Sequence, residues 1–160
     1  MTNFYTDVIQ KSPLFHSTAR ISDLGLLEPA TRAAVQAIIA DARVLGHDMT
    51  VFETFRSQAR QEQLFENGAT ELRHVGVHGY GLAADIVKAG LEPWQGDFTF
   101  LLPLARRHGL ISGQDWGKPG VRHSFVDADH VQRCGLADQD RLFAGSWYPD
   151  TGYNPYGVSA

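Results

Sequence analysis

One short segment, residues 78–87 (HGYGLAADIV), places a carboxylate inside an apolar stretch. Residues 82–87 are predicted to form a buried strand, and a buried carboxylate is unfavourable unless it is paired or binds a cation. Within that strand Asp85 shares a face with Ala83, whose small side chain leaves room beside the carboxylate. The fold must therefore bring a cation or hydrogen-bond donors to Asp85.

His78 is a candidate partner for Asp85. Their spacing would put them on opposite faces of one flat strand, but Gly79 and Gly81 allow the chain to turn between them. A second interpretation stays open from the residues alone. In it, loop amides bind Asp85 and His78 lies at the surface.

A second cluster of ionisable residues occupies positions 127–132 (DADHVQ). His130 opens a strand-like stretch, and the turn before it would let Asp127 reach the same site. Two histidines and one carboxylate, with a fourth position for water, are the composition of a catalytic zinc site. Asp127 would then serve as the general base and acid. On spacing alone Asp129 competes for that role, and a solvent-facing turn residue is its simpler interpretation.

Composition excludes several kinds of metal site and several classes of protein. The single cysteine, Cys134, excludes an intramolecular disulfide and a cysteine-based zinc cluster, whereas seven histidines are present. The 160 residues, 43% of them hydrophobic, suit one domain. A net charge of −4 without a basic block argues against nucleic-acid binding. We find no signal-peptide pattern and no apolar run long enough for a membrane span, and so expect a soluble protein.

Periodicity and capping residues predict an α+β fold, a small antiparallel sheet with two to three helices. Helices are expected at 29–45, 58–67 and 97–108, with Pro103 kinking the last or delaying its start. Strands are expected at 49–54, 82–87 and within 124–132, with a short segment at 110–111.

The domain organisation is expected to be a lead-in at 1–20, one catalytic domain at 21–136 and a C-terminal arm at 137–160. The arm is rich in Tyr, Pro and Gly and is expected to pack on the same domain through its aromatic side chains. The alternative is that these side chains, Trp147, Tyr148, Tyr153 and Tyr156, flank the cleft.

Arg56 follows the strand at 49–54 and precedes a helix that Ser57 would cap. A surface salt bridge with Glu53 or Glu62 is its simpler interpretation. In the functional alternative its guanidinium binds a substrate carboxylate or stabilises an oxyanion.

The motifs in their order resemble the zinc peptidoglycan peptidases, which include D-alanyl-D-alanine carboxypeptidases, vancomycin-resistance dipeptidases and L-alanyl-D-glutamate phage endolysins. The resemblance spans 21–132 and rests on the segments ISDL (21–24), ETFRSQARQEQL (53–64), GVHGYGLAADIV (76–87), HGLISGQDWG (108–117) and HSFVDADHVQ (123–132). It implies a single hedgehog/DD-peptidase-like domain that binds Zn²⁺.

Position by position, the resemblance implies that His78, Asp85 and His130 are the zinc ligands and that Asp127 is the catalytic carboxylate. It implies that Arg56 helps to bind substrate and to polarise the scissile carbonyl. The same comparison implies substrate-binding roles for Gln63 and Trp116.

The sequence departs from the family pattern at Gly76, where many members have Ser, and at Ser112 and Gln114, where Trp and Gly are common. These changes bear on a hydrogen bond behind the metal site and on the shape of the cleft. The remaining histidines are expected in loop, surface, capping or structural roles: His16, His47, His74, His108 and His123, the last also a candidate to support Asp127 or the metal.

The expected function is hydrolysis of an amide bond in the peptidoglycan stem peptide, with L-alanyl-D-glutamate favoured over D-alanyl-D-alanine. A non-enzymatic wall-binding subunit of a virion or secretion apparatus is the alternative from another class. We expect a monomer that is made in the cytoplasm without a signal peptide. It would act on the wall after release by another system such as a holin, as a phage-type endolysin does.

Overall fold

The computed structural model describes residues 3–116, 126–150 and 153. Its centre is a four-stranded antiparallel sheet in the order β1-β2-β4-β3. The strands are β1 (Met49–Glu53), β2 (Ala83–Lys88), β3 (Ile111–Ser112) and β4 (His130–Gln132), and the α-helices are α1 (Pro29–Val44), α2 (Gln58–Glu66), α3 (Leu101–Arg107) and α4 (Leu136–Phe143). The expected α+β architecture with a small antiparallel sheet is confirmed.

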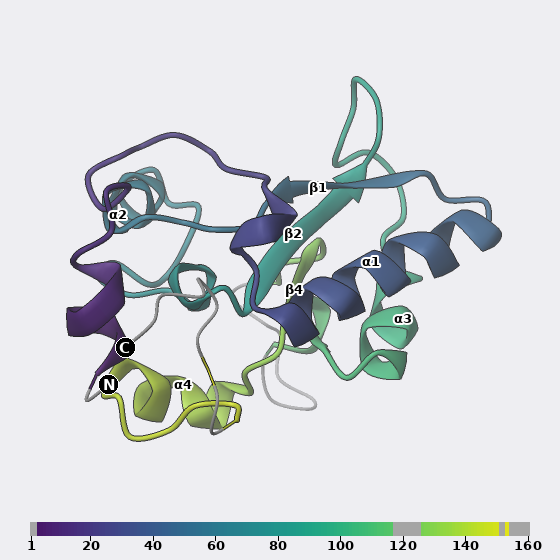
Figure 1. The fold of residues 1–160 in the computed structure, drawn as a ribbon. Coiled ribbons are helices and arrows are strands. Elements are labelled where there is room, and N and C mark those ends of the chain that lie inside the picture. Colours follow the sequence, from purple (N-terminus) through teal and green to yellow (C-terminus); the bar gives the residue numbers. More distant parts are fainter. Residues whose placement is uncertain (1–2, 117–125, 151–152, 154–160) are drawn as a thin grey trace.

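Helices α1 and α3 lie side by side over one face of the sheet (Figure 1). The apolar stripe of α1 includes Val35 and Ile38, and it packs with Leu101 of α3 against Ile86 of β2 and Val131 of β4. This core fixes which face each strand residue takes, because successive side chains point to opposite sides of a sheet. The polar residues next to Ile86 and Val131 therefore point to the other side.

A second core joins the two ends of the described chain. Phe4, from the segment leading into the short helix η1 (Tyr5–Ile9), packs with Tyr80, Leu142 of α4 and Tyr153. The Phe4 amide also donates to the hydroxyl of Tyr148 at 2.7 Å. The described aromatic side chains of the C-terminal arm thus pack on the domain, whereas Tyr156 lies outside the described residues.

Two expected element boundaries differ from those in the structure. Helix α3 begins at Leu101, and Asp97 instead accepts hydrogen bonds from the amide and hydroxyl of Thr99 in the preceding turn. The delay agrees with Pro103, which lies in the first helical turn, where a missing N–H is tolerated. Helix α4 was expected as part of an irregular arm, because its eight residues carry no strong start signal.

The loop expected before β2 contains a short 3₁₀ helix, η3 (Val77–Tyr80). Two further 3₁₀ turns are η2 (Leu24–Leu26) and η4 (Gly113–Asp115). Among the helices that the structure describes, none has both the length and the apolar character needed to cross a membrane.

Candidate metal centre and active-site cavity

Three carboxylate or imidazole side chains lie in a row across neighbouring strands. Asp85 on β2 pairs directly with His130 on β4 and with Glu53 on β1. Because Ile86 and Val131 face the α1–α3 core, Asp85 and His130 point to the opposite side of the sheet. Direct cross-strand neighbours on one face have Cβ atoms only ~5 Å apart, so the strand pairing itself brings two of the three expected ligands together.

A bulge in β1 brings Glu53 to this face. Val51 pairs with Ile86, but the next pair along is Glu53 with Asp85, so Phe52 is an extra residue in β1. Without the bulge, the two-residue alternation would turn Glu53 towards the α1–α3 core. The shift places both Phe52 and Glu53 beside the same cavity.

His78 reaches Asp85 from η3, and the chain turns into β2 at Gly81, which has a positive φ of 67°. The Nδ1 atom of His78 lies 2.8 Å from the carbonyl oxygen of Thr54, which accepts its proton. That hydrogen bond leaves Nε2 as the basic nitrogen. His78 Nε2 lies 3.3 Å from Asp85 Oδ1.

His130 is oriented by Gln132, a residue that the sequence analysis did not select. Its Nδ1 lies 3.1 Å from Asp85 Oδ1, and its Nε2 lies 2.8 Å from the side-chain oxygen of Gln132. The amide nitrogen of Gln132 donates to the carbonyl oxygen of Cys134, so its oxygen is the atom that accepts from His130. Nδ1 is then the nitrogen of His130 that remains for a metal.

The three donor atoms fit a zinc ion. His78, Asp85 and His130 are buried, and their candidate ligand atoms lie within 4.8 Å of one another. Within the described part of the chain, His78 Nε2 is a buried nitrogen with no hydrogen-bond partner, as expected for a metal ligand. Two imidazole nitrogens and one carboxylate oxygen match the ligand types that zinc prefers and leave a position for water.

Electrostatics keeps Asp85 ionised. Burial alone would raise the pKa of Asp85, but the charges of His78 and His130 and the hydrogen bond of His130 hold that pKa well below its usual value. Burial lowers the pKa of His130, but its hydrogen bond and charge interaction with Asp85 give a net rise. Zinc and protons compete for the imidazole nitrogens, which makes zinc binding dependent on pH.

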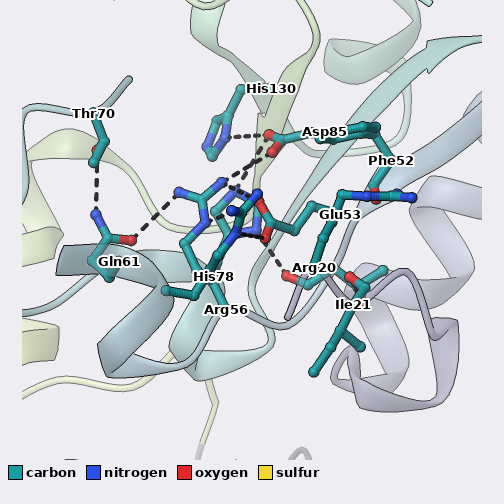
Figure 2. Close-up of polar contacts among 12 residues, drawn as sticks. Arg20, Ile21, Phe52, Glu53, Arg56, Gln61, Thr70, His78, Asp85 and His130 are labelled. Atoms are coloured by element: carbon teal, nitrogen blue, oxygen red, sulfur yellow. Dashed lines mark hydrogen bonds and ion pairs between the residues drawn. The ribbon is translucent and has the colours of Figure 1, made fainter. Parts of the chain in front are cut away.

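Arg56 lies inside this network rather than at the surface. Its guanidinium donates to Glu53 Oε2 at 2.8 Å and to Asp85 Oδ2 at 3.1 Å, and its side chain is 11% exposed (Figure 2). Asp85 thus offers Oδ1 to the histidines and Oδ2 to Arg56. The expected salt bridge with Glu53 exists, and the same guanidinium also lines the cavity, as the functional alternative requires.

The glutamine beside Arg56 is Gln61 rather than Gln63. The side-chain oxygen of Gln61 accepts from Arg56 at 3.4 Å, and its amide donates to Thr70 at 3.2 Å (Figure 2). Gln63 is an exposed residue of α2, outside the cavity lining, and contacts Arg60. The helical period explains the difference, since positions two apart on a helix point in different directions.

Gly76 leaves room for that Gln61 amide. A Cβ atom built at Gly76 would lie 2.6 Å from Gln61 Oε1. Where many family members have Ser, this chain has Gly76, and the side-chain amide of Gln61 occupies the space that the Ser side chain would need. Gln61 thereby supports Arg56 from the side opposite Asp85.

Asp127 and Asp129 both line the cavity. Burial, a hydrogen bond with Asp127 and the negative charges of Asp85 and Asp127 raise the pKa of Asp129 to about 8. Asp129 also accepts from the indole nitrogen of Trp94 at 3.2 Å. A protonated Asp129 can donate this hydrogen bond to Asp127.

Gln114 and Ser112, the two other positions that differ from the family pattern, form hydrogen bonds to backbone groups near Asp127 and Asp129. The amide of Gln114 donates to the carbonyl oxygens of Phe98 and Ala128, at 2.7 Å and 3.0 Å. The hydroxyl of Ser112 accepts from the Gln114 backbone amide at 3.1 Å and so caps η4. Gln114 therefore holds the segment that carries Asp127 and Asp129, and Ser112 caps the turn that carries Gln114.

The cavity has a volume of about 380 Å³, within the range of small-molecule and peptide sites. Trp116 forms part of its wall and packs on the ring of His130, with centroids 4.8 Å apart. The cavity therefore contains the three ligand candidates, both aspartates, Arg56 and Trp116.

The other histidines of the described chain lie away from the ligand atoms. His74 is exposed, 3.6 Å from Glu62. His16 and His47 contact Phe15 and Phe100, and His108 binds Asp41. His123 lies outside the described residues.

Comparison with known proteins was made by sequence and by fold. No family model matches the chain. The peptidoglycan L-alanyl-D-glutamate endopeptidase CwlK of Bacillus subtilis (strain 168) is 25% identical, over 74% of this chain and 81% of that protein.

Solved structures give the same fold. The L-Ala D-Glu endopeptidase ChiX of Serratia marcescens superposes with a TM-score of 0.57 at 21% identity, over 79% of this chain and 96% of that chain. The vancomycin-resistance D,D-pentapeptidase VanY in complex with Zn(II) gives 0.55 at 17% identity, over 74% and 78%. The resemblance to zinc carboxypeptidases and endopeptidases indicated by the motifs is thus confirmed, and the relatives of this chain are peptidoglycan peptidases.

Proposed function

We propose that this protein is a zinc-dependent peptidase that cleaves the L-alanyl-D-glutamate bond of the peptidoglycan stem peptide. The observation that carries the proposal is the buried His78–Asp85–His130 set, in which His78 Nε2 makes no hydrogen bond, in one cavity with Asp127 and Arg56. A non-catalytic wall-binding module would have no need for a carboxylate and a guanidinium beside the ligand set.

His78 Nε2, Asp85 Oδ1 and His130 Nδ1 would hold the zinc ion. When bound, zinc supplies a Lewis acid and lowers the pKa of a coordinated water to about 7. Asp127 takes a proton from the attacking water and returns it to the leaving amine, a role typically worth 10²–10⁴-fold in rate. Asp129 already accepts a hydrogen bond from the indole nitrogen of Trp94 at 3.2 Å, which supports Asp127 rather than Asp129 in this role.

Arg56 binds the scissile carbonyl. Glu53, Asp85 and Gln61 take four of its five N–H donors. The remaining donor, on Nη1, has no partner within the described part of the chain. Since four donors fix the guanidinium plane, that N–H is already oriented for an oxygen that becomes more negative during the reaction.

The choice of bond rests on the relatives. CwlK and ChiX are both named for cleavage at L-alanyl-D-glutamate. VanY, at a similar TM-score, is named as a D,D-pentapeptidase, and for this reason D-alanyl-D-alanine carboxypeptidase activity is the second candidate.

The resemblance to phage endolysins supports a lysis role, in which another system such as a holin or a secretion apparatus releases the protein to the wall. A monomer is proposed because all the ligand candidates come from one chain.

The test is digestion of a defined muropeptide, N-acetylglucosaminyl-N-acetylmuramyl tetrapeptide or pentapeptide, followed by mass spectrometry. The proposal predicts a product in which the sugars retain only L-alanine. Loss of the terminal D-alanine alone would identify the carboxypeptidase instead. Asp127→Ala should keep one bound zinc and lose cleavage by at least 10²-fold, while full activity in that variant would overturn the role of Asp127.

A further inference from the structure

An aromatic wall stands at the edge of the cavity. It consists of Phe52, at the bulge of β1, and Trp94, in the segment that follows β2. Their rings meet edge to face with centroids 4.8 Å apart, and both residues line the cavity that contains the ligand candidates. Trp94 is nevertheless 54% exposed.

The wall is held rigidly although it is exposed. The indole nitrogen of Trp94 donates to Asp129, and the carbonyl oxygen of the preceding Pro93 accepts from the Lys88 amide at 2.9 Å. The guanidinium of Arg20 stacks on the Phe52 ring, 4.3 Å from its centroid. Because the polar atom of the indole is already bound within the protein, what Trp94 presents to solvent is an apolar ring surface.

This surface lies close to the reacting groups. Asp129, which fixes Trp94, directly precedes the ligand candidate His130 in the chain and lines the cavity beside Asp127. A group that contacts Trp94 therefore belongs to a substrate portion near the bond that is cut. An exposed aromatic ring that lines the cavity of the reacting groups is a candidate contact for substrate.

The substrate offers few groups that match an aromatic surface. The stem peptide carries small or charged side chains, from alanine, glutamate and a diamino acid, whereas the attached sugars are six-membered rings with apolar C–H faces. In the L-alanyl-D-glutamate bond, one residue, a span of about 3.5 Å, separates the cut from the lactyl group that joins the peptide to the sugar ring. In the terminal D-alanyl-D-alanine bond, four residues intervene, or about 14 Å.

We propose that Trp94 and Phe52 form a subsite for the face of the N-acetylated pyranose that carries the stem peptide. The inference rests on the proposed function and deepens it, because only a cut next to the sugar brings the pyranose ring to the aromatic wall of Phe52 and Trp94. The subsite makes the protein prefer stem peptides that are still attached to glycan. The subsite would also let the catalytic domain itself recognise the glycan of the bacterial cell wall.

The test compares two substrates in the zinc-loaded full-length protein: a disaccharide tetrapeptide and the same tetrapeptide without sugars. The measured quantity is the ratio of their kcat/KM values. The wild type should favour the glycan-bearing substrate by about tenfold, and Trp94→Ala should bring the ratio close to one. Trp94→Phe should keep most of the preference, because it retains a ring. Leu91→Ala, a fully exposed residue of the same segment outside the cavity lining, is the matched control and should leave the ratio unchanged.

A wild-type ratio near one, or a ratio unaffected by Trp94→Ala, would overturn the subsite. The sugar subsite can be tested even if the proposed catalytic activity is wrong. If the wild type cleaves neither substrate, calorimetric titration with the peptide-free disaccharide measures directly whether the subsite binds sugar. Binding that is lost in Trp94→Ala and kept in Leu91→Ala supports the subsite, and absence of binding to the wild type overturns it.

Discussion

Gly113 and Asp127 are in such close contact that the structure has no room for a side chain at position 113. A Cβ atom built on Gly113 would lie 2.3 Å from the carbonyl oxygen of Asp127 and 2.9 Å from its Cβ atom. The Asp127 amide in turn donates to the Gly113 carbonyl oxygen at 3.3 Å. The position of the proposed catalytic carboxylate therefore depends on a glycine fourteen residues earlier.

We predict that Gly113→Ala lowers cleavage by about 10²-fold, because a displacement of ~1 Å at a reacting group has effects of that size. Zinc stoichiometry should stay at one per chain, since His78, Asp85 and His130 do not touch Gly113. Steady-state kinetics and metal analysis of the purified variant test both statements.

Gly135→Ala is the matched control. A Cβ at Gly135 would meet only ordinary contacts, the nearest at 3.6 Å, and its φ of −70° suits any residue. Activity should remain at the wild-type level. Equal loss in the two variants would contradict a specific requirement at Gly113.

Much of this centre could be predicted from sequence. The strand expected at 82–87 placed Asp85 on one face with Ala83, and the resemblance to zinc peptidoglycan peptidases implied His78 and His130 as its partners. What the sequence could not predict depends on contacts between distant segments. The β1 bulge that turns Glu53 to the cavity has no local signature, and neither does the packing that selects Gln61 over Gln63.

Gln132 was missed for a related reason. A glutamine two residues after a histidine carries no chemical signal until both are known to lie on one strand and one face. Helix α4 went unrecognised because tertiary packing through Leu142, rather than a capping residue, stabilises it.

Gln132→Ala should weaken zinc binding by about 10–100-fold, because His130 loses the acceptor that fixes its orientation. Gln132→Glu should retain or strengthen the affinity, since a carboxylate accepts the same proton. Competition with a chromophoric chelator measures the dissociation constants without reference to activity. Gln63→Ala, on the exposed face of α2, should bind zinc as the wild type does, and a similar loss there would refute the assignment.

Gly76→Ser tests the space occupied by Gln61. The new side chain would collide with Gln61 Oε1, so we expect a loss of about 1–3 kcal/mol in unfolding free energy. Gln61→Ala removes the obstacle, and the double variant should therefore be more stable than the sum of the single effects predicts. Urea denaturation of the four proteins measures the coupling, and strict additivity would show that the two sites do not compete for space.

The contact between α1 and α3 should respond to acid. The hydrogen bond from His108 and, to a smaller extent, contacts with Arg107 lower the pKa of Asp41 below 3.8. A depressed pKa contributes stability above the unfolded value and loses it as the pH falls through the folded value. Asp41→Asn should therefore be less stable than wild type at about pH 6, and the difference should shrink as the pH falls through the lowered pKa of Asp41.

The control for the acid response is Asp48→Asn. Asp48 lies 3.8 Å from Arg43 in a pair whose side chains are more than 70% exposed, so little change is expected at either pH. A difference for Asp41→Asn that persists unchanged at acidic pH would contradict the ionic origin of its contribution.

Zinc-dependent cleavage is tested most directly by titrating the metal-free protein with zinc while cleavage of the disaccharide tetrapeptide is followed by mass spectrometry. We expect no cleavage without metal and full cleavage at one zinc per chain, with L-alanine retained on the sugar. His78→Ala should abolish the response at that stoichiometry. Cleavage that persists in chelator, or a fully zinc-loaded protein that leaves the muropeptide intact, would contradict the proposed function.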